Sequence, residues 1–186
     1  MSDVMRPVKF KHLLRWMLEE YQNQSSIFSV PENKFFYKKD KAFFEIFGEK
    51  CETAIGPAAG PHTQQASNLV ASYLAGGRFF ELKTVQIMDA LDIEKPCIDV
   101  PDEGYNTEWS TEFSVQEAFE EYVKSWFLLH ILNKMFGLSQ LDERAFVFNM
   151  SVGYDLEGIK SPKIDGFIEG LKDASKTEIF QECVRD

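Results

Sequence analysis

The stretch from Cys51 to Val85 constrains the fold of this 186-residue chain more than any other. It reads CETAIGPAAGPHTQQASNLVASYLAGGRFFELKTV: a short apolar strand, a loop rich in glycine, proline and alanine, a helix ended by Gly76 and Gly77, and a strand containing Lys83. This order predicts a strand-loop-helix-strand unit of the parallel α/β class. Ligands of such folds bind where the strands end, so this loop is the first candidate for a site.

The chain before the helix of this unit predicts a further helix and a hairpin. Apolar residues recur every three or four positions over residues 8–22, which indicates an amphipathic helix. Two short apolar runs, 42–47 and 51–55, flank a glycine-containing turn and predict a β-hairpin whose second arm is also the first strand of a barrel. We therefore divide the chain into an N-terminal helix and loop, residues 1–41, and an α/β barrel part, residues 42–186.

The chain after this unit continues to alternate between helix and strand. A long polar loop over residues 89–111 precedes the capping-box pattern SVQE at 114–117, which starts a helix that ends at Gly137. The run AFVFNMS, residues 145–151, predicts the next strand, and two helices complete the chain, the first starting at Ser161. Together these elements predict an incomplete TIM-type (β/α) barrel with an N-terminal helix and β-hairpin.

Composition excludes several classes of function. The net charge is −10 and the pI is near 4.9, which argues against nucleic acid as a partner, because phosphate binding needs a basic face. No run approaches the roughly 18 apolar residues of a membrane span. The three cysteines, Cys51, Cys97 and Cys183, are far apart and lack metal-site spacing, so we expect no metal and a reducing cytoplasm.

The common catalytic templates are missing from the sequence. It contains neither a GxGxxG dinucleotide-binding motif nor a GxSxG nucleophile elbow. The glycine-rich loop GPAAGPHT lacks the Gly-Lys-Ser/Thr ending that a phosphate-binding loop requires. His12, His62 and His130 fall in unrelated elements, which leaves hydrolase triads and histidine metal sites unsupported. We expect His130 to be an ordinary helix residue and not a catalyst.

Small and polar residues instead gather at the predicted strand ends. Small residues let a flat ring approach the backbone, a lysine neutralises an electron-rich heterocycle, and amides bond its edge, which together favour a flavin. The set comprises Ala58, Ala59 and Gly60 after the first strand, Lys83 and Thr84 after the second, Asn106 in the long loop, and Asn149 and Ser151 in the third.

Structural interpretations stand beside these functional ones. The glycines and proline of the loop can simply shape a turn. Lys83 can pair with Glu81, because the two side chains share one face of a strand and a buried unpaired charge is costly. Asn106 can cap the long loop internally.

An ordered series of motifs resembles a known family. The motifs MRPVKFKHLL, GPAAGPHTQ, ELKTVQIMD, EKPCID, YNTEWSTEF and FNMSVGYDLEGIK extend across most of the chain. The chain resembles the dihydroorotate dehydrogenase family of FMN-binding barrels, and more closely the N-terminal region of the large selenate reductase subunits. The resemblance implies an N-terminal part of an FMN-dependent oxidoreductase with a small-molecule substrate.

The resemblance also implies roles for single residues. Ala58, Ala59 and Gly60 would lie against the flavin, Lys83 and Thr84 would contact its pyrimidine side, Asn149 would bind the flavin, and Asn106 would bind the substrate. A complete barrel of this class needs about 250 residues and binds phosphate after strands seven and eight. No catalytic residue is assigned, because the family's catalytic cysteine or serine lies in a later strand.

Two functions therefore remain open. The chain can be part of a flavoenzyme whose downstream domains or partner subunit hold any iron-sulfur or FAD groups. It can also be a truncated scaffold or interaction subunit that binds no flavin alone, because an incomplete barrel exposes strand edges.

Overall fold

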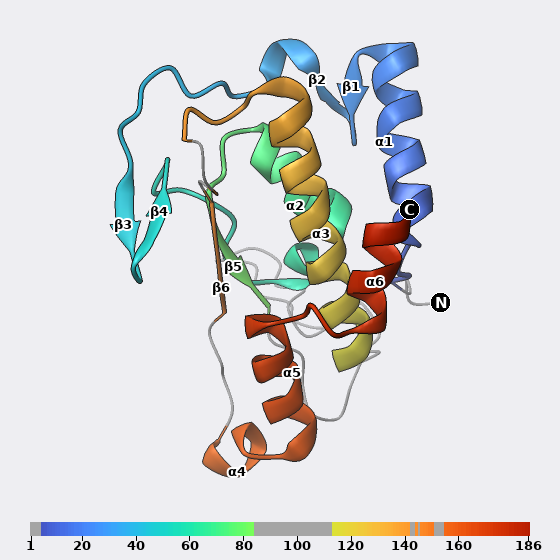
Figure 1. Cartoon of the computed structure of the whole chain (residues 1–186), viewed down its shortest axis with the longest axis vertical. Coiled ribbons are helices and arrows are strands. Elements are labelled where there is room, and N and C mark those ends of the chain that lie inside the picture. The colour runs from blue at the N-terminus through green and yellow to red at the C-terminus, as the bar shows by residue number, and fades with distance from the viewer. Residues whose placement is uncertain (1–4, 84–112, 142–143, 145, 151–154) are drawn as a thin grey trace, which may run out of the picture.

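The computed structural model describes residues 5–83, 113–141, 144, 146–150 and 155–186. Two parallel strands, β5 (Phe79–Leu82) and β6 (Val147–Met150), lie between a hairpin and a layer of helices (Figure 1). Helices α2 (Ala66–Leu74) and α3 (Val115–Phe136) pack beside this sheet. The predicted polar loop over residues 89–111 lies outside the described residues.

The first barrel strand was predicted at residues 51–55, and that position is wrong. The strand β4 ends at Cys51, and the segment that runs along β5 is 55–57 instead. The Ile55 carbonyl accepts a hydrogen bond from Phe79 N at 3.1 Å, and the Pro57 carbonyl accepts one from Glu81 N at 3.2 Å. The two bonds are two residues apart along each of the two segments, which is the spacing of a parallel ladder.

Two residues explain why this segment is not a regular strand. Pro57 has no N–H, so it cannot return the hydrogen bond that a full parallel ladder requires. A Cβ atom on Gly56 would lie 1.6 Å from the Phe79 carbonyl oxygen, so only glycine permits this close approach. The loop sequence therefore sets how closely the segment lies against β5.

The predicted hairpin is confirmed, with a tighter turn than expected. Strands β3 (Phe44–Ile46) and β4 (Glu49–Cys51) are antiparallel and pair Ile46 with Glu49. The two turn residues, Phe47 and Gly48, both have positive φ angles, 54° and 77°. Positive φ at both positions is what a two-residue hairpin turn of type I′ requires.

The predicted ends of α3 and the predicted start of α5 are confirmed. Ser114 and Glu117 form the expected capping box of α3, and Gly137 ends that helix with φ 63°. Ser161 caps α5 through a bond from Ile164 N. The other elements are α1 (Phe10–Gln24), β1 (Ser26–Ile27), β2 (Val30–Pro31), η1 (Glu32–Lys34), η2 (Pro61–Gln64), α4 (Leu156–Ile159), α5 (Pro162–Lys172) and α6 (Glu178–Arg185). Of these, the β1–β2 pair, the short helices η1 and η2, and α4 were not predicted.

One hydrophobic core joins these elements. Phe10, Leu13 and Met17 of α1 are buried in the same cluster as α2 and α3. Phe80 of β5 lies edge-on to Phe148 of β6, with ring centroids 5.4 Å apart. The division of the chain at residue 41 stays a prediction.

Candidate functional site

The two faces of the parallel sheet differ in chemistry. Phe148 lies 5.6 Å from the ring of Trp126 in α3, so Phe148 and its neighbour Phe80 face the helices. Side chains alternate along a strand, so Glu81 faces the opposite side. Asn149 is the register partner of Glu81 and shares that face. In a (β/α) barrel the face away from the helices is the barrel interior.

A turn of small residues lies directly beside Glu81. The Glu81 carboxylate accepts a hydrogen bond from Ala59 N at 3.1 Å. The next amide, Gly60 N, donates to the Thr63 hydroxyl at 3.2 Å, and that hydroxyl donates back to the Gly60 carbonyl at 2.9 Å. Side chains from two elements thus hold the turn after the 55–57 segment in one conformation.

Lys83 follows β5 at the same end of the sheet. Its side chain is buried, and its carbonyl accepts a hydrogen bond of 2.5 Å from the hydroxyl of Tyr122 in α3. This bond fixes the end of β5 against the helix layer. Thr84 and Asn106 of the predicted site, and Ser151, lie outside the described residues.

The structure therefore brings several predicted residues to one end of the sheet. We call this set the carboxyl-end cluster; it comprises Ala58, Ala59, Gly60, Glu81, Lys83 and Asn149. In the sequence, Glu81 was considered only as a possible partner for Lys83. Its bond to the Ala59 amide was missed, because nothing in the sequence relates positions 22 residues apart.

A second polar site lies at the amino end of β5. Arg78 and Glu52 have completely buried side chains, with Arg78 Nε 3.4 Å from a carboxylate oxygen of Glu52. Arg78 Nη1 donates to the carbonyls of Tyr73 at 2.7 Å and Gly77 at 2.9 Å. The guanidinium group also lies 4.0 Å from the centre of the Tyr73 ring.

The second carboxylate oxygen of Glu52 completes this site. It accepts hydrogen bonds of 2.9 Å from the Ser139 hydroxyl and from Gln140 N. We call the six residues the amino-end network: Glu52, Tyr73, Gly77, Arg78, Ser139 and Gln140. Sequence analysis missed it, and its only signal is a charged residue placed immediately before an apolar strand, as in GGRFFEL.

The remaining titratable candidates are structural. His130 packs against Trp126 and Phe146, and partial burial lowers its pKa, with Arg144 adding to the effect. Burial raises the pKa of the Cys183 thiol to about 12, so it is an unreactive thiol at neutral pH. Within the described part of the chain, no group of His, Cys, Asp or Glu side chains could hold a metal ion.

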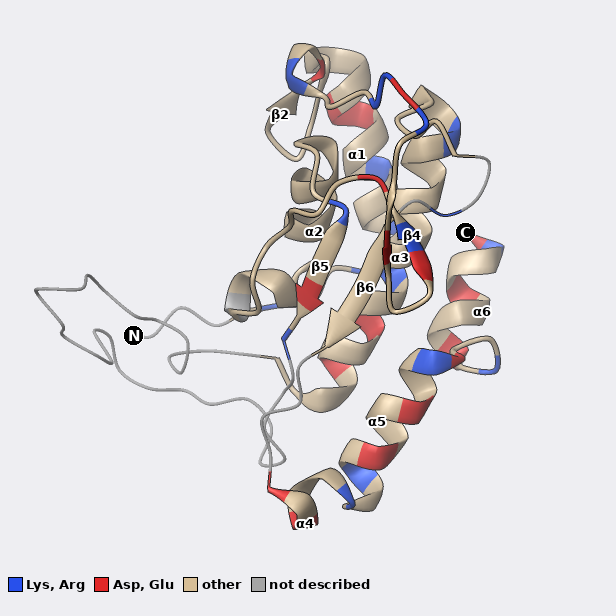
Figure 2. Cartoon of the chain, turned by 90° about the vertical axis from the view of Figure 1, so that its left-hand side faces the viewer, with Lys and Arg blue, Asp and Glu red and all other residues tan. Residues whose placement is uncertain are grey.

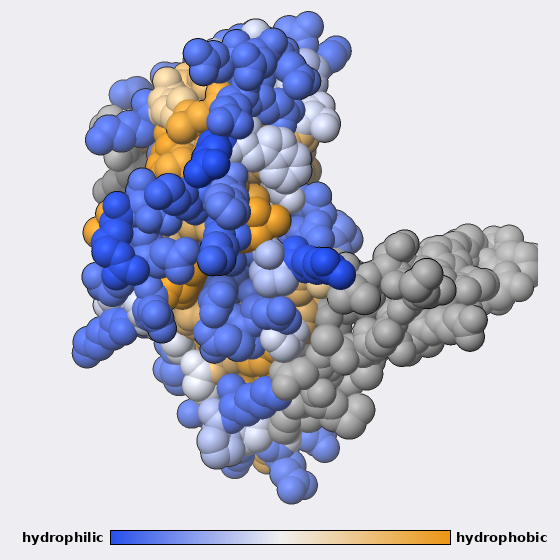
Figure 3. All heavy atoms as spheres, turned by 90° about the vertical axis from the view of Figure 1, so that its right-hand side faces the viewer, coloured by the Kyte–Doolittle hydropathy of each residue, from blue (hydrophilic) through white to orange (hydrophobic). Residues whose placement is uncertain are grey.

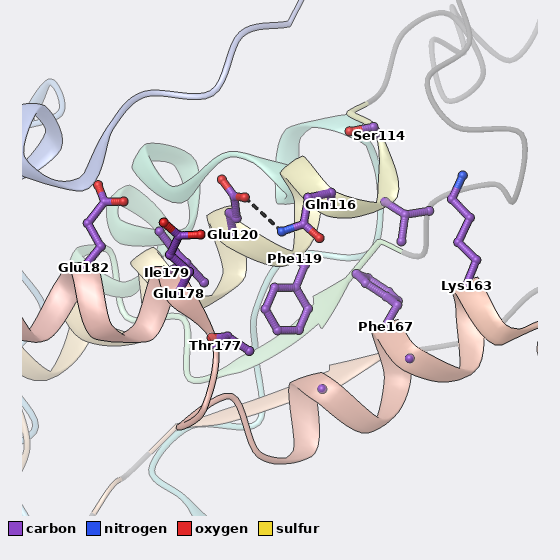
Figure 4. Close-up of a pocket in the computed structure, with 13 residues that line it drawn as sticks. Ser114, Gln116, Phe119, Glu120, Lys163, Phe167, Thr177, Glu178, Ile179 and Glu182 are labelled. Atoms are coloured by element: carbon purple, nitrogen blue, oxygen red, sulfur yellow. Dashed lines mark hydrogen bonds between the residues drawn. The ribbon is translucent and has the colours of Figure 1, made fainter.

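A pocket of about 700 Å³ lies between the helices α3, α5 and α6. Figure 4 shows its polar side chains, among them Gln116, whose amide donates to Glu120 at 2.9 Å along the same helix. Acidic and basic side chains are interspersed along α5 and α6 (Figure 2). The pocket contains none of the predicted site residues, so it is separate from the carboxyl-end cluster. No helix in the described part of the chain is long and apolar enough to cross a membrane.

Comparisons with known proteins agree with this architecture. Residues 28–186 match the family described as "Oxidoreductase YgfK, N-terminal TIM-barrel domain". The chain is 55% identical over 182 residues to "Putative oxidoreductase YgfK" of Escherichia coli (strain K12), and equally to its counterpart in Escherichia coli O157:H7. Each match covers 98% of this chain and 18% of the relative. No solved structure matches.

The predicted fold class is thereby confirmed. Parallel segments with helices on one face, and no closed barrel among the described residues, correspond to the early part of a TIM barrel. The chain spans less than a fifth of the length of these relatives. It belongs to the family of oxidoreductase YgfK N-terminal TIM-barrel domains.

Proposed function

We propose that this chain supplies the first part of an FMN site in an oxidoreductase whose barrel resembles those of dihydroorotate dehydrogenases and selenate reductase large subunits. The observation that carries the proposal is the carboxyl-end cluster. A lysine, an asparagine and a turn of three small residues lie at one end of neighbouring parallel segments. This is the end at which barrel enzymes bind their ligands.

The chemistry of the cluster fits a flavin. The side chains of Ala58, Ala59 and Gly60 are no larger than a methyl group, so a flat ring can approach this backbone. Lys83 would hold the electron-rich pyrimidine end of the ring, and the Asn149 amide would hydrogen-bond to its edge. When bound, FMN supplies hydride or electron transfer. Glu81 acts indirectly, because its carboxylate orients the Ala59 amide.

The rest of the proposed site lies elsewhere. Thr84 would bind flavin beside Lys83, and Asn106 would contact a small-molecule substrate. The FMN phosphate needs the loops after strands seven and eight of a barrel. Downstream domains or a partner subunit would supply the phosphate-binding loops and any iron-sulfur or FAD groups. The assembled protein would act in the cytoplasm.

A second proposal concerns the 186-residue chain alone, which would act as a scaffold and bind no flavin. The observation that favours it is the sheet itself, which contains only two regular parallel strands in the described residues. Such a chain would present part of a site and an open edge to its partner.

Flavin content distinguishes these proposals. The chain would be purified alone and as an extended chain, continued by the polypeptide that follows the matched segment in the Escherichia coli K12 relative. We expect flavin absorbance from the extended chain and a colourless isolated chain. A folded extended chain that binds no added FMN would exclude the flavin site, and a yellow isolated chain would exclude the scaffold.

A further inference from the structure

We infer that the pocket between α3, α5 and α6 is a docking groove for a basic segment of the polypeptide that lies downstream in the full-length protein. The groove has a volume of about 700 Å³, and no residue of β5 or β6 lines it. A barrel closes by pairing its strands, with the helices in an outer ring, so closure does not require this groove to be filled. The inference does not depend on flavin binding.

Carboxylates line one end of the groove. Figure 4 shows Glu120 of α3 with Glu178 and Glu182 of α6 toward this end. Lys163 of α5 lies at the opposite end. Within the described part of the chain, none of the three carboxylates forms an ion pair. Three negative charges without a neutralising partner attract a cation, so this end of the groove favours a Lys or Arg side chain.

Apolar side chains form the floor of the groove. Phe119 of α3 and Phe167 of α5 lie edge-on to each other, with ring centroids 6.3 Å apart. Val115 and Ile179 complete this floor. Lys and Arg bury their hydrocarbon stems along apolar surface while the charged end stays among polar groups. A stem that lies across the floor would therefore bring its charged end to the three carboxylates.

A glycine in the wall of the groove has no packing reason within the described residues. Glycine destabilises a helix interior relative to alanine, and α5 contains two, Gly166 and Gly170. A Cβ atom on Gly170 would lie 2.9 Å from the ring of Phe119, so packing explains that glycine. A Cβ atom on Gly166 would meet no described atom within 4 Å, although this residue lines the groove. Gly166 therefore keeps open a space that an outside segment can fill.

The occupant we commit to is downstream polypeptide of the same protein. This chain covers 18% of the length of its relatives, so most of their polypeptide lies outside it. A second copy of this chain fits less well, because each copy has a net charge of −10. Figure 3 shows that the side of the molecule with α1 and α6 is mainly hydrophilic, with hydrophobic atoms only in narrow areas. Such a surface suits a partner that binds through charge and a narrow apolar strip.

Thiol labelling of the purified extended chain tests whether the groove is occupied. Gly166→Cys places a thiol in the groove without a clash, and Glu169→Cys places one on the exposed surface of the same helix, outside the groove. A segment docked for about nine-tenths of the time slows modification about tenfold, so we expect at least this difference between the two thiols. Mass spectrometry of the labelled peptides measures both rates. Equal rates in a folded extended chain would overturn the inference.

Charge reversal tests the nature of the occupant. Glu182→Lys places a cation in the last turns of α6, where a helix tolerates it, and should restore fast labelling in the Gly166→Cys chain. Glu157→Lys, an exposed change in α4 outside the groove, should leave that labelling slow. Slow labelling that persists with Glu182→Lys would overturn a basic occupant. Slow labelling that disappears on dilution would assign the groove to a second copy and overturn the downstream occupant.

Discussion

The two ends of β5 place their charged residues in different surroundings. At the amino end, Arg78 and Glu52 are completely buried and bind each other and the backbone. At the carboxyl end, Glu81 binds the amide of Ala59 in a turn of small residues, on the side of the sheet away from the helices, and the buried Lys83 follows directly after the strand. In barrels the amino-terminal face serves stability and the carboxyl-terminal face serves chemistry. One four-residue strand thus connects a structural site to a candidate ligand site.

The largest effect should come from removing the charge at the amino end. Arg78→Met leaves the Glu52 carboxylate buried without its cation, which should lower the free energy of unfolding by about 3–5 kcal/mol. Urea unfolding followed by circular dichroism measures this change. A loss below about 1 kcal/mol, typical of an exposed ion pair, would contradict the structural role of the amino-end network.

A double substitution provides the matched control. In Arg78→Met combined with Glu52→Gln, no charge remains buried, so part of the lost stability should return. The coupling between the two sites follows from a double-mutant cycle. Strict additivity of the two single changes would show that the 3.4 Å pair is not energetically coupled.

Lys83→Met, at the carboxyl end, should lower the affinity for FMN more than it lowers the stability of the fold. Methionine keeps the apolar length of the buried side chain and removes its charge. Hydrogen bonds to charged groups contribute about 1.5–3 kcal/mol, so FMN affinity of the extended chain should fall about tenfold or more. Titration with FMN measures the affinity, and the exposed Lys172→Met is the control. Equal affinity in both variants would remove Lys83 from the site.

Patterns among neighbouring residues predicted the helices and strands around these two sites, but not the contacts within the sites. The Ser114 capping box, the Gly137 helix end and the strand around Asn149 follow from patterns within a few residues, and all appear in the structure. The contacts that define each site span longer distances: 26 residues from Glu52 to Arg78 and 22 from Ala59 to Glu81.

The first barrel strand shows a second reason why sequence was insufficient. Apolar content placed that strand at residues 51–55, whereas backbone sterics place the parallel segment at 55–57. Gly56 and Pro57 have the composition of a turn, and yet Gly56 permits a close approach of its backbone to Phe79 of β5. Propensity describes single residues, but this contact depends on what lies opposite them.

Alkaline pH offers a smaller test of the amino-end network. Burial raises the pKa of Tyr73 to about 12, from the ordinary value of 10.0, so the folded state favours the neutral phenol. Its contribution to stability is complete below pH 10.0 and is lost as the pH rises toward about 12. The unfolding free energy should fall less steeply over this range in Tyr73→Phe than in the parent chain. Identical slopes would show that Tyr73 does not titrate differently in the two states.

The smallest effect should come from Glu81→Ala, which removes the acceptor of the Ala59 amide at the carboxyl end. Loss of the hydrogen bond to the Ala59 amide should lower the unfolding free energy by about 1 kcal/mol. Exchange at Ala59 N should accelerate, while exchange at Gly60 N should not change, because Thr63 still binds that amide. Glu81→Gln retains a carbonyl oxygen and should preserve the protection of Ala59 N. If Glu81→Gln released the amide as fully as alanine does, the negative charge of Glu81 and not its hydrogen-bond geometry would hold the turn.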